Sequence, residues 1–371
     1  MRIGVPAEIC PGETRVAATP ETIKKLSAGG RHAVMVESGA GQHAAIPDAD
    51  FAAAGAALGS AADIYSQSEI ILKVRGPEPS ELPLLRRGII LVGLLSPHLG
   101  VEPLAQAGVT GFAMELLPRI SRAQAMDVLS SQGSIAGYKA VMLAANEYGR
   151  FMPMLMTAAG TVKAARVLIL GAGVAGLQAI ATAKRLGAVI EAFDVRPAVK
   201  EQVESLGAKF VEVTLSEEEK RSVETSGGYA REMSDDYKQR QAALIAERAK
   251  AADIVITTAL IPGRPAPLLV TDETLKGMKP GSVVVDLAVM QGGNCAGSKA
   301  DSLTIRHGVK ILAPSSLPSS VAADASALYA RNLLNFINLL TDPKTGELKF
   351  DRSDEIIAGT LVCTDGAAVR S

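Results

Sequence analysis

The sequence predicts an α/β protein built from two doubly wound, parallel-sheet domains joined by long helices. Three observations predict it. Short apolar runs alternate with helical patterns in the first third of the chain, and the same alternation restarts near residue 165. Hydrophobic residues make up 48% of the 371 residues, enough for more than one core. Apolar strands that alternate with helices favour parallel sheets covered on both faces.

The N-terminal third of the chain begins this alternation. Its expected strands are "IGVP", "AVMVESG", "EIILKVRG", "GIILVGLL" and "VTGFAMELL". The stretch "PETIKKLSAGG" predicts a helix with Thr19 as N-cap and Pro20 at the first helical position. The stretch "DADFAAAGAAL" predicts another helix, capped by Asp48 or Asp50, and a long helix is expected from about Gln132 to Gly149.

The pattern restarts with "ARVLILGAGVAGLQAIATAKRLGAVIEAFDVRP". Further strands are expected in "AKFVEV", "DIVITTAL", "SVVVDLAV" and "GVKILAP", and a last long helix follows Pro318 and Ser319. We therefore expect a first domain of residues 1–131 plus 322–371 and an inserted second domain of residues 132–321. The tail "GELKFDRSDEIIAGTLVCTDG" is expected to return to the first domain.

Composition excludes several classes of protein. The net charge is −1, tryptophan is absent and aromatic residues are 4%, so a nucleic-acid partner is not expected. The scattered cysteines Cys10, Cys295 and Cys363 form neither a disulfide framework nor a metal site, and they indicate a reducing, cytosolic compartment. The N-terminus lacks the apolar stretch of a signal peptide, and no uninterrupted apolar run reaches the length of about 18 residues typical of a membrane span.

The strongest motif is G-x-G-x-x-G, formed by Gly171, Gly173 and Gly176 between an apolar strand and a helix. In this motif the first glycine permits the tight turn, the second lets the backbone approach a pyrophosphate, and the third lets helix and strand pack closely. Asp194 ends the next strand, where a carboxylate accepts hydrogen bonds from ribose hydroxyls and repels a 2′-phosphate. The motif predicts a Rossmann-like domain that binds a dinucleotide, and Asp194 favours NAD(H) over NADP(H). Arg196 softens this preference for NAD(H), and FAD is the alternative cofactor.

Other candidate residues lie at strand ends and in one long connection. Leu260 and residues 287–289 follow later strands. They either line the site of the nicotinamide ring or belong to the hydrophobic core. Arg15, Lys73 and His98 stand at polar strand ends of the first domain; burial of Lys73 is unfavourable unless it faces a cleft, and His98 is either structural or catalytic. The charged segment at about 216–241 exceeds an ordinary connection of about 2–6 residues and is either a solvated insertion or a lid.

The stretch "PRISRAQAMD" places Arg119, Arg122, Gln124 and Asp127 between two core-like segments, with Ser130 close behind. It belongs to a wider resemblance, carried by "PRISRAQAMDVLSSQ", "MTAAGTVKAARVLILGAGVAGLQAIATAKRLGA", "KEQVESLGAKF", "GGYAREM", "TTALIPGRPAP", "MKPGSVVVDLAV", "GGNC" and "VAADAS". Over essentially its whole length, the chain resembles the soluble NAD(H)-binding component, domain I, of proton-translocating NAD(P) transhydrogenase. The fold is shared with alanine dehydrogenase.

The resemblance implies roles for named residues. Arg119, Gln124 and Asp127 match a loop that orients the nicotinamide and its ribose, and Tyr229 matches the tyrosine of a mobile loop that closes over the nucleotide. The same resemblance places further residues at the nucleotide site: Ser121, Ser130, Ala172, Val174, Val195, Arg196, Gly228, Gln241 and Leu260. A surface salt bridge beside a capped helix remains the alternative explanation of the Arg–Gln–Asp set.

The implied activity is Re/Si-specific, proton-translocating transhydrogenation. Hydride passes directly between NAD(H) on this chain and NADP(H) on a partner component. No proton moves at the reacting carbons, so no general acid or base is needed and no metal is expected. Alanine dehydrogenase must instead bind a carboxylate and move protons. Arg15, Lys73 and His98 match its residues, but Met290 stands where its catalytic aspartate belongs. An alanine dehydrogenase-like enzyme is the main alternative, and an NAD-sensing or scaffolding protein is a third.

The resemblance also implies partners and a location. The chain is similar to the split form of the enzyme, in which this component is a separate polypeptide. We expect a homodimer that docks onto membrane-spanning and NADP(H)-binding subunits. It is expected in the cytoplasm, peripherally associated with the inner membrane through those subunits.

Overall fold

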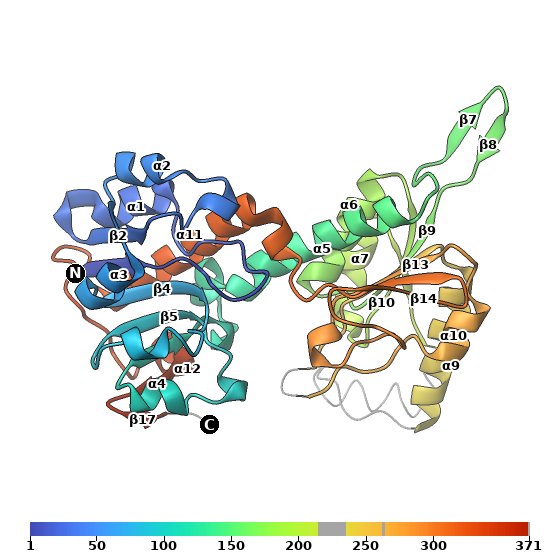
Figure 1. Ribbon diagram of the computed structural model, residues 1–371. Helices are drawn as coiled ribbons and strands as arrows, with labels where there is room; N and C mark the ends of the chain where they lie inside the picture. The colour runs from blue at the N-terminus through green and yellow to red at the C-terminus, as the bar shows by residue number, and fades with distance from the viewer. Residues whose placement is uncertain (214–234, 262–263, 370–371) are drawn as a thin grey trace. The chain divides into compact units, whose positions relative to one another are not determined.

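The computed structural model describes residues 1–213, 235–261 and 264–369. The chain forms two compact units: Met1–Gln132 with Pro318–Ser371 (unit 1), and Gly133–Leu317 (unit 2). Each unit contains one large sheet, mostly parallel, flanked by helices (Figure 1). The predicted fold class is confirmed.

Unit 1 is built on an eight-stranded sheet with the order β17-β16-β6-β5-β4-β1-β2-β3. Its strands are β1 Arg2–Val5, β2 Ala33–Glu37, β3 Ala57–Gly59, β4 Ile70–Arg75, β5 Ile90–Leu94, β6 Thr110–Ala113, β16 Leu361–Thr364 and β17 Ala367–Ala368. Its helices are α1 Pro20–Ser27, α2 Asp48–Ala53, α3 Ala61–Gln67, α4 Glu102–Gln106, α11 Ala322–Leu340 and α12 Glu355–Thr360. The six parallel strands lie in the order 3-2-1-4-5-6, and β16 and β17 extend the edge in antiparallel pairing.

Unit 2 repeats this arrangement with the order β11-β10-β9-β12-β13-β15-β14. Its strands are β9 Arg166–Leu170, β10 Val189–Phe193, β11 Lys209–Val211, β12 Ile254–Thr257, β13 Val283–Asp286, β14 Leu303–Arg306 and β15 Val309–Leu312. Its helices are α6 Val174–Arg185, α7 Lys200–Ser205, α9 Asp235–Ala251 and α10 Asp272–Gly277. The strand order reverses between β9 and β12, and in such sheets ligands bind beyond the carboxyl ends of the strands at that point.

Shorter elements and one long helix complete the described chain. Helix α5, Val128–Glu147, starts in unit 1 and continues into unit 2. The short 3₁₀ helices are Ala28–Gly30, Gln42–Ala44, Leu82–Leu84, Pro97–Leu99, Met114–Leu116, Ser121–Met126, Pro197–Val199, Val289–Gln291 and Pro318–Val321. A hairpin of β7 Leu155–Thr157 and β8 Gly160–Val162 extends away from the sheet of unit 2 (Figure 1).

Apolar strands and one amphipathic helix build the core of unit 1. In β4 the first five residues are buried, as expected for a strand covered on both faces. Helix α11 contributes Tyr329, Leu333, Phe336, Ile337 and Leu340 to that core. The Phe336 ring meets the Phe112 ring of β6 edge-on, with centroids 5.4 Å apart.

Two glycines of α5 let it approach the start of α6 closely. A Cβ on Gly137 would lie 2.0 Å from the carbonyl oxygen of Ala175, so the backbones are in direct contact there. At Gly133, one turn earlier, the nearest atom is Cγ1 of Val174 at 3.7 Å, an ordinary packing distance. The position of the α6 N-terminus therefore depends on the absence of a side chain at residue 137.

Several details differ from the sequence-based expectation. The strand predicted for "VTGFAMELL" ends at Ala113, because Met114–Leu116 turn into a 3₁₀ helix. The predicted cap of α2 was wrong: Pro47 precedes the helix, and the Asp48 carboxylate accepts from the Gly39 backbone N–H instead. The long helix starts at Val128 rather than Gln132. No helix in the part of the chain that the structure describes combines the length and apolar character needed to cross a membrane.

Candidate nucleotide-binding site

The turn between β9 and α6 has the backbone geometry that the glycine motif requires. Gly171 has φ +102°, and the Thr258 hydroxyl after β12 donates to its carbonyl oxygen at 3.0 Å. A Cβ on Gly176 would lie 1.8 Å from that same carbonyl, so only glycine allows this packing. Gly173 precedes α6 and has open space around its Cα, where N–H groups of the helix start favour an anion. The turn has the room and the donors that a diphosphate needs.

Asp194 lies directly after β10, beside this turn. Its Oδ2 accepts from the Ala172 backbone N–H at 2.8 Å, and its Oδ1 accepts from the Arg196 backbone N–H at 2.9 Å. The Arg196 guanidinium also donates to both oxygens, at 2.9 Å each. Burial alone would raise the pKa of Asp194, but these hydrogen bonds and the charge of Arg196 outweigh it and lower the pKa. The carboxylate is therefore ionised and fixed in place.

Two loops at the carboxyl ends of β12 and β13 are tied together by buried polar groups. The Asn294 side chain donates to the carbonyl oxygens of Ala259 and Pro267, at 2.9 and 2.8 Å, and accepts from the Ala259 N–H. The fully buried Asp286 carboxylate accepts from five donors: Thr257 Oγ1, Ser298 Oγ and the backbone N–H groups of Ala288, Asn294 and Cys295. These contacts fix the loops that present Leu260 and Met290, which are both exposed.

The Arg–Gln–Asp loop lies in unit 1, between β6 and α5. Asp127 is the N-cap of α5, because its Oδ1 accepts from the Ser130 backbone N–H at 2.9 Å and its Oδ2 accepts from the Ser130 hydroxyl at 2.5 Å. Arg119, Ser121 and Gln124 are exposed. Within the described part of the chain, the side chains of Arg119 and Gln124 make no hydrogen bond or ion pair.

The backbone of this loop is nevertheless held firmly. Ala123 and Met126 are buried in the core of unit 1. Arg122 forms a two-pronged ion pair with Asp354, at 2.7 and 2.9 Å. On the other side, Asn332 and Asn335 of α11 both donate to the Ala125 carbonyl oxygen. The loop thus presents two polar side chains, those of Arg119 and Gln124, that are unpaired within the described ranges, and its backbone is fixed, as expected of a ligand-positioning loop.

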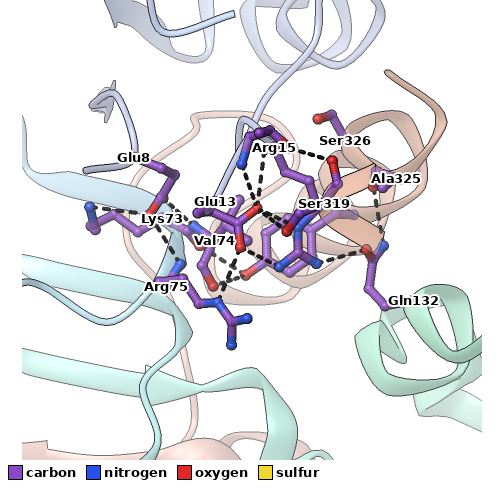
Figure 2. Close-up of polar contacts among 12 residues, drawn as sticks. Glu8, Glu13, Arg15, Lys73, Val74, Arg75, Gln132, Ser319, Ala325 and Ser326 are labelled. Carbon is purple, nitrogen blue, oxygen red and sulfur yellow. Dashed lines mark hydrogen bonds and ion pairs between the residues drawn. The ribbon is translucent and has the colours of Figure 1, made fainter. Parts of the chain in front are cut away.

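A buried ionic cluster fills the region around Arg15 and Lys73 in unit 1 (Figure 2). The Arg15 guanidinium donates to both carboxylate oxygens of Glu13, at 2.7 and 2.6 Å, and to the Gln132 side-chain oxygen at 2.8 Å. Lys73 is 1% exposed and lies 2.7 Å from Glu81 and 3.5 Å from Glu8. Its burial is therefore balanced by two carboxylates rather than by an open cleft.

The pKa values of Glu8 and Glu13 in this cluster shift in opposite directions. Burial raises the pKa of Glu8 to about 7, although Lys73 and the Val74 N–H act against that rise. Burial would also raise the pKa of Glu13, but hydrogen bonds and charge from Arg15 outweigh it and lower the pKa. His98, by contrast, lies exposed on the short helix Pro97–Leu99.

The remaining predicted residues are distributed as follows. Val174 and Val195 are exposed beside the glycine turn, and Ala172, which is part of that turn, is buried. Gln241 lies in helix α9 rather than in a loop. Gly228 and Tyr229, with most of the charged segment, lie outside the described residues. No cluster of three or more potential metal ligands occurs among the residues that the structure describes.

The structure adds supporting residues that sequence reasoning missed: Asn294, Asp286, Thr258, Asn332, Asn335 and Asp354. A signal was available for Asp286, because a carboxylate at the end of "SVVVD" occupies an otherwise apolar, buried strand. The asparagines of α11 interrupt an apolar helix in the same way. For Asp354 the sequence holds no sign of its distant partner Arg122.

Comparison with known proteins identifies related chains. Residues 4–136 match the family described as alanine dehydrogenase/PNT, N-terminal domain, and residues 140–371 match alanine dehydrogenase/PNT, C-terminal domain. The chain that forms the first part of NAD(P) transhydrogenase subunit alpha in Rhodospirillum rubrum is 51% identical over 378 residues, which cover 100% of this chain and 98% of the relative.

Two further relatives are similar over nearly the whole chain. The crystal structure of transhydrogenase from Sinorhizobium meliloti superposes with a TM-score of 0.89 at 48% identity, covering 100% of both chains. The alanine dehydrogenase of Mycobacterium tuberculosis is 31% identical over 380 residues, covering 99% of this chain and 94% of the relative.

Proposed function

The chain belongs to the alanine dehydrogenase/PNT family, and we propose that it is the NAD(H)-binding component of a proton-translocating NAD(P) transhydrogenase. Within that family it shares 51% identity with a transhydrogenase subunit and 31% with an alanine dehydrogenase. In this proposal NAD(H) is a substrate that binds and leaves in each turnover. NADP(H) binds a separate partner component.

The observation that carries the proposal is the fixed loop that presents Arg119 and Gln124, whose side chains have no partner among the described residues. An exposed guanidinium and amide on a loop anchored at Ala123 and Met126 can donate hydrogen bonds to a carboxamide or a ribose. Asp127 supplies an acceptor at the start of α5. Such groups can bind and orient a nicotinamide, but neither Arg119 nor Gln124 can act as a general base near neutral pH.

Direct hydride transfer needs positioning rather than acid–base chemistry. When NAD(H) is bound, its nicotinamide ring supplies the hydride chemistry. In our proposal the residues of this chain hold the diphosphate at the glycine turn, the adenosine ribose at Asp194, and the nicotinamide end at Arg119, Gln124 and Asp127. Their contribution to rate comes from alignment and exclusion of water, and such positioning can supply several kcal/mol, on the order of 7–11 in well-oriented model reactions.

The buried ionic cluster argues against alanine dehydrogenation. An amino-acid substrate needs a cation for its carboxylate, yet Arg15 is paired with Glu13, and Lys73 is paired with Glu81 and Glu8. An incoming carboxylate would have to compete with those partners. At the carboxyl end of β13 the exposed Met290 offers a thioether, which cannot accept or donate a proton in catalysis. We therefore propose that L-alanine is not turned over.

The assembly belongs to the same proposal. The β7–β8 hairpin exposes Met154, Leu155 and Met156, with Met156 73% exposed. Apolar side chains clustered on a projecting hairpin are typical of protein–protein contacts, which supports a homodimer. The other proposed partners are the NADP(H)-binding and membrane-spanning subunits, with this chain docked peripherally on the cytoplasmic side of the membrane.

The test is reconstitution. Purified chain is mixed with an NADP(H)-binding transhydrogenase component, and NADH-dependent reduction of an NAD analogue is followed with and without NADP(H). We expect activity only when both proteins and NADP(H) are present. Binding of NADH without activity in any reconstitution would contradict the proposal. So would formation of NADH from NAD⁺ and L-alanine above a no-enzyme blank, which would favour the amino-acid dehydrogenase.

Two variants locate the site. Gln124→Ala and Asp127→Ala should reduce the reconstituted rate by about tenfold to a thousandfold, because misplacement of reacting groups by about 1 Å can cost that much. The matched control is Gln67→Ala, which removes an amide from the exposed end of α3 and should leave the rate unchanged.

A further inference from the structure

The Asp194 carboxylate has no acceptor site left for a ribose. A carboxylate offers about four lone-pair sites. Two are filled by the backbone N–H groups of Ala172 and Arg196, and two by Nε and Nη2 of the Arg196 side chain. The hydroxyls of an adenosine ribose are donors that need such sites. Some of the present donors must therefore leave before a ribose can bind.

The two kinds of donor differ in how easily they leave. The backbone N–H groups belong to the glycine turn and to the turn after β10, so removing them would rebuild the nucleotide site itself. The Arg196 side chain is 43% exposed, and apart from Asp194 it has no partner among the residues described. Water can solvate its guanidinium when it swings away, whereas the Asp194 side chain is only 5% exposed and stays.

We propose that Arg196 is the specificity-determining residue of this site: its guanidinium occupies the ribose-diol position on Asp194 and is displaced when NAD(H) binds. The inference rests on the proposed function, because it assumes an adenine dinucleotide at this turn. It goes beyond that function by assigning to Arg196 competition with NAD(H) rather than attraction.

The same displacement sets the choice between the two dinucleotides. For NAD(H), Arg196 gives up a two-pronged ion pair and gains only solvent, which weakens binding. For NADP(H), the released guanidinium meets a 2′-phosphate, which it binds well, and so offsets the repulsion from Asp194. Arg196 therefore brings the two affinities closer together, and its removal should separate them.

The experiment measures the dissociation constants of NADH and NADPH by titrating their own fluorescence with the purified chain, which contains no tryptophan. In Arg196→Gln we expect NADH to bind about threefold more tightly and NADPH about threefold more weakly, the size of effect typical of a partly exposed ion pair. Arg196→Lys keeps the charge but loses the planar fork, so NADH should tighten while NADPH changes less. The control is Arg331→Gln, which removes the comparable pair with Glu21 on unit 1 and should change neither constant.

The outcomes separate the inference from the proposed function. Unchanged or weaker NADH binding in both folded Arg196 variants, with normal binding by the original chain, would overturn the inference and leave the function intact. Failure of the original chain to bind NADH would overturn both. Circular dichroism confirms folding, and if Arg196→Gln does not fold, tighter NADH binding by Arg196→Lys supports the inference and weaker binding overturns it.

Discussion

Adding one methyl group at Gly137 should damage the nucleotide site, while the same change at Gly133 should not. A Cβ on Gly137 would lie 2.0 Å from the Ala175 carbonyl oxygen and 2.8 Å from its carbon. Both neighbouring atoms are backbone, so α5 and α6 must separate by about 1 Å or more. Overpacking of this kind costs about 1–3 kcal/mol. It also moves the second residue of α6, whose N-terminus is the proposed diphosphate site.

Gly133→Ala is the matched control in the same helix. Its new Cβ would meet Val174 Cγ1 at 3.7 Å, an ordinary contact. Replacing a helix-interior glycine by alanine then stabilises by about 0.5–1 kcal/mol. The two substitutions are chemically identical, so the opposite signs come only from the atoms that face each residue.

The assay is thermal unfolding followed by circular dichroism at 222 nm, with an NADH titration of each variant. A change of 1 kcal/mol shifts Tm by about 2–4 °C in a unit of about 150–250 residues. We expect Gly137→Ala to lower Tm by several degrees and weaken NADH binding about tenfold or more, with Gly133→Ala equal to or above the original chain. Equal Tm values and equal NADH affinities for the two variants would refute the reasoning.

Three further predictions follow from buried or exposed groups. Burial raises the pKa of Glu8 from 4.5 to about 7, so between these pH values the folded chain holds a proton that the unfolded chain has lost. The free energy of unfolding should therefore fall as the pH rises through this range, by up to about 3 kcal/mol. Glu8→Gln should remove that component, and parallel stability–pH curves from denaturant titrations of the two chains would contradict this. Asp286→Asn replaces a carboxylate that accepts five hydrogen bonds, so it should destabilise unit 2 by about 2–4 kcal/mol and raise KM for NADH more than it lowers kcat; an unchanged melting curve would show that the carboxylate does not hold these loops. Met156→Asp should shift the mass measured by light scattering from dimer to monomer, with Ile305→Asp on the exposed edge strand β14 as the control; a dimer in both variants would exclude the hairpin as the interface.

The sequence was informative where local chemistry decides the structure. Buried strands such as "VLIL" in β9 read as continuous apolar runs because both faces of a parallel sheet are covered. The G-x-G-x-x-G spacing directly after β9 is typical of a dinucleotide-binding turn, so the position of this turn could be predicted from the sequence. In both units the six parallel strands lie in the order 3-2-1-4-5-6 typical of doubly wound sheets.

The structural features that could not be predicted from the sequence depend on contacts with residues far apart in the chain. The edge strand β14 is mostly exposed and lacks a continuous apolar run, and β7 and β8 of the hairpin have only three residues each. Gly137 looks like an ordinary small residue in a helix until Ala175 is seen against it. The sequence suggested that Arg196 modifies the preference of Asp194, but only the structure gives the occupied acceptor sites. In each case a tertiary contact, not local propensity, carries the information.

The central claim, direct hydride transfer between two nicotinamides, is tested most directly with an isotope. NADH carrying deuterium at both C4 positions is supplied to the reconstituted proteins with NADP⁺, and the NADPH formed is analysed by mass spectrometry. The C4–D bond of NADH breaks, the deuteride forms the new bond at C4 of NADP⁺, and no proton is exchanged. Our account predicts that each NADPH carries one deuterium. NADPH formed without the label, or with label diluted by protons from water, would contradict it.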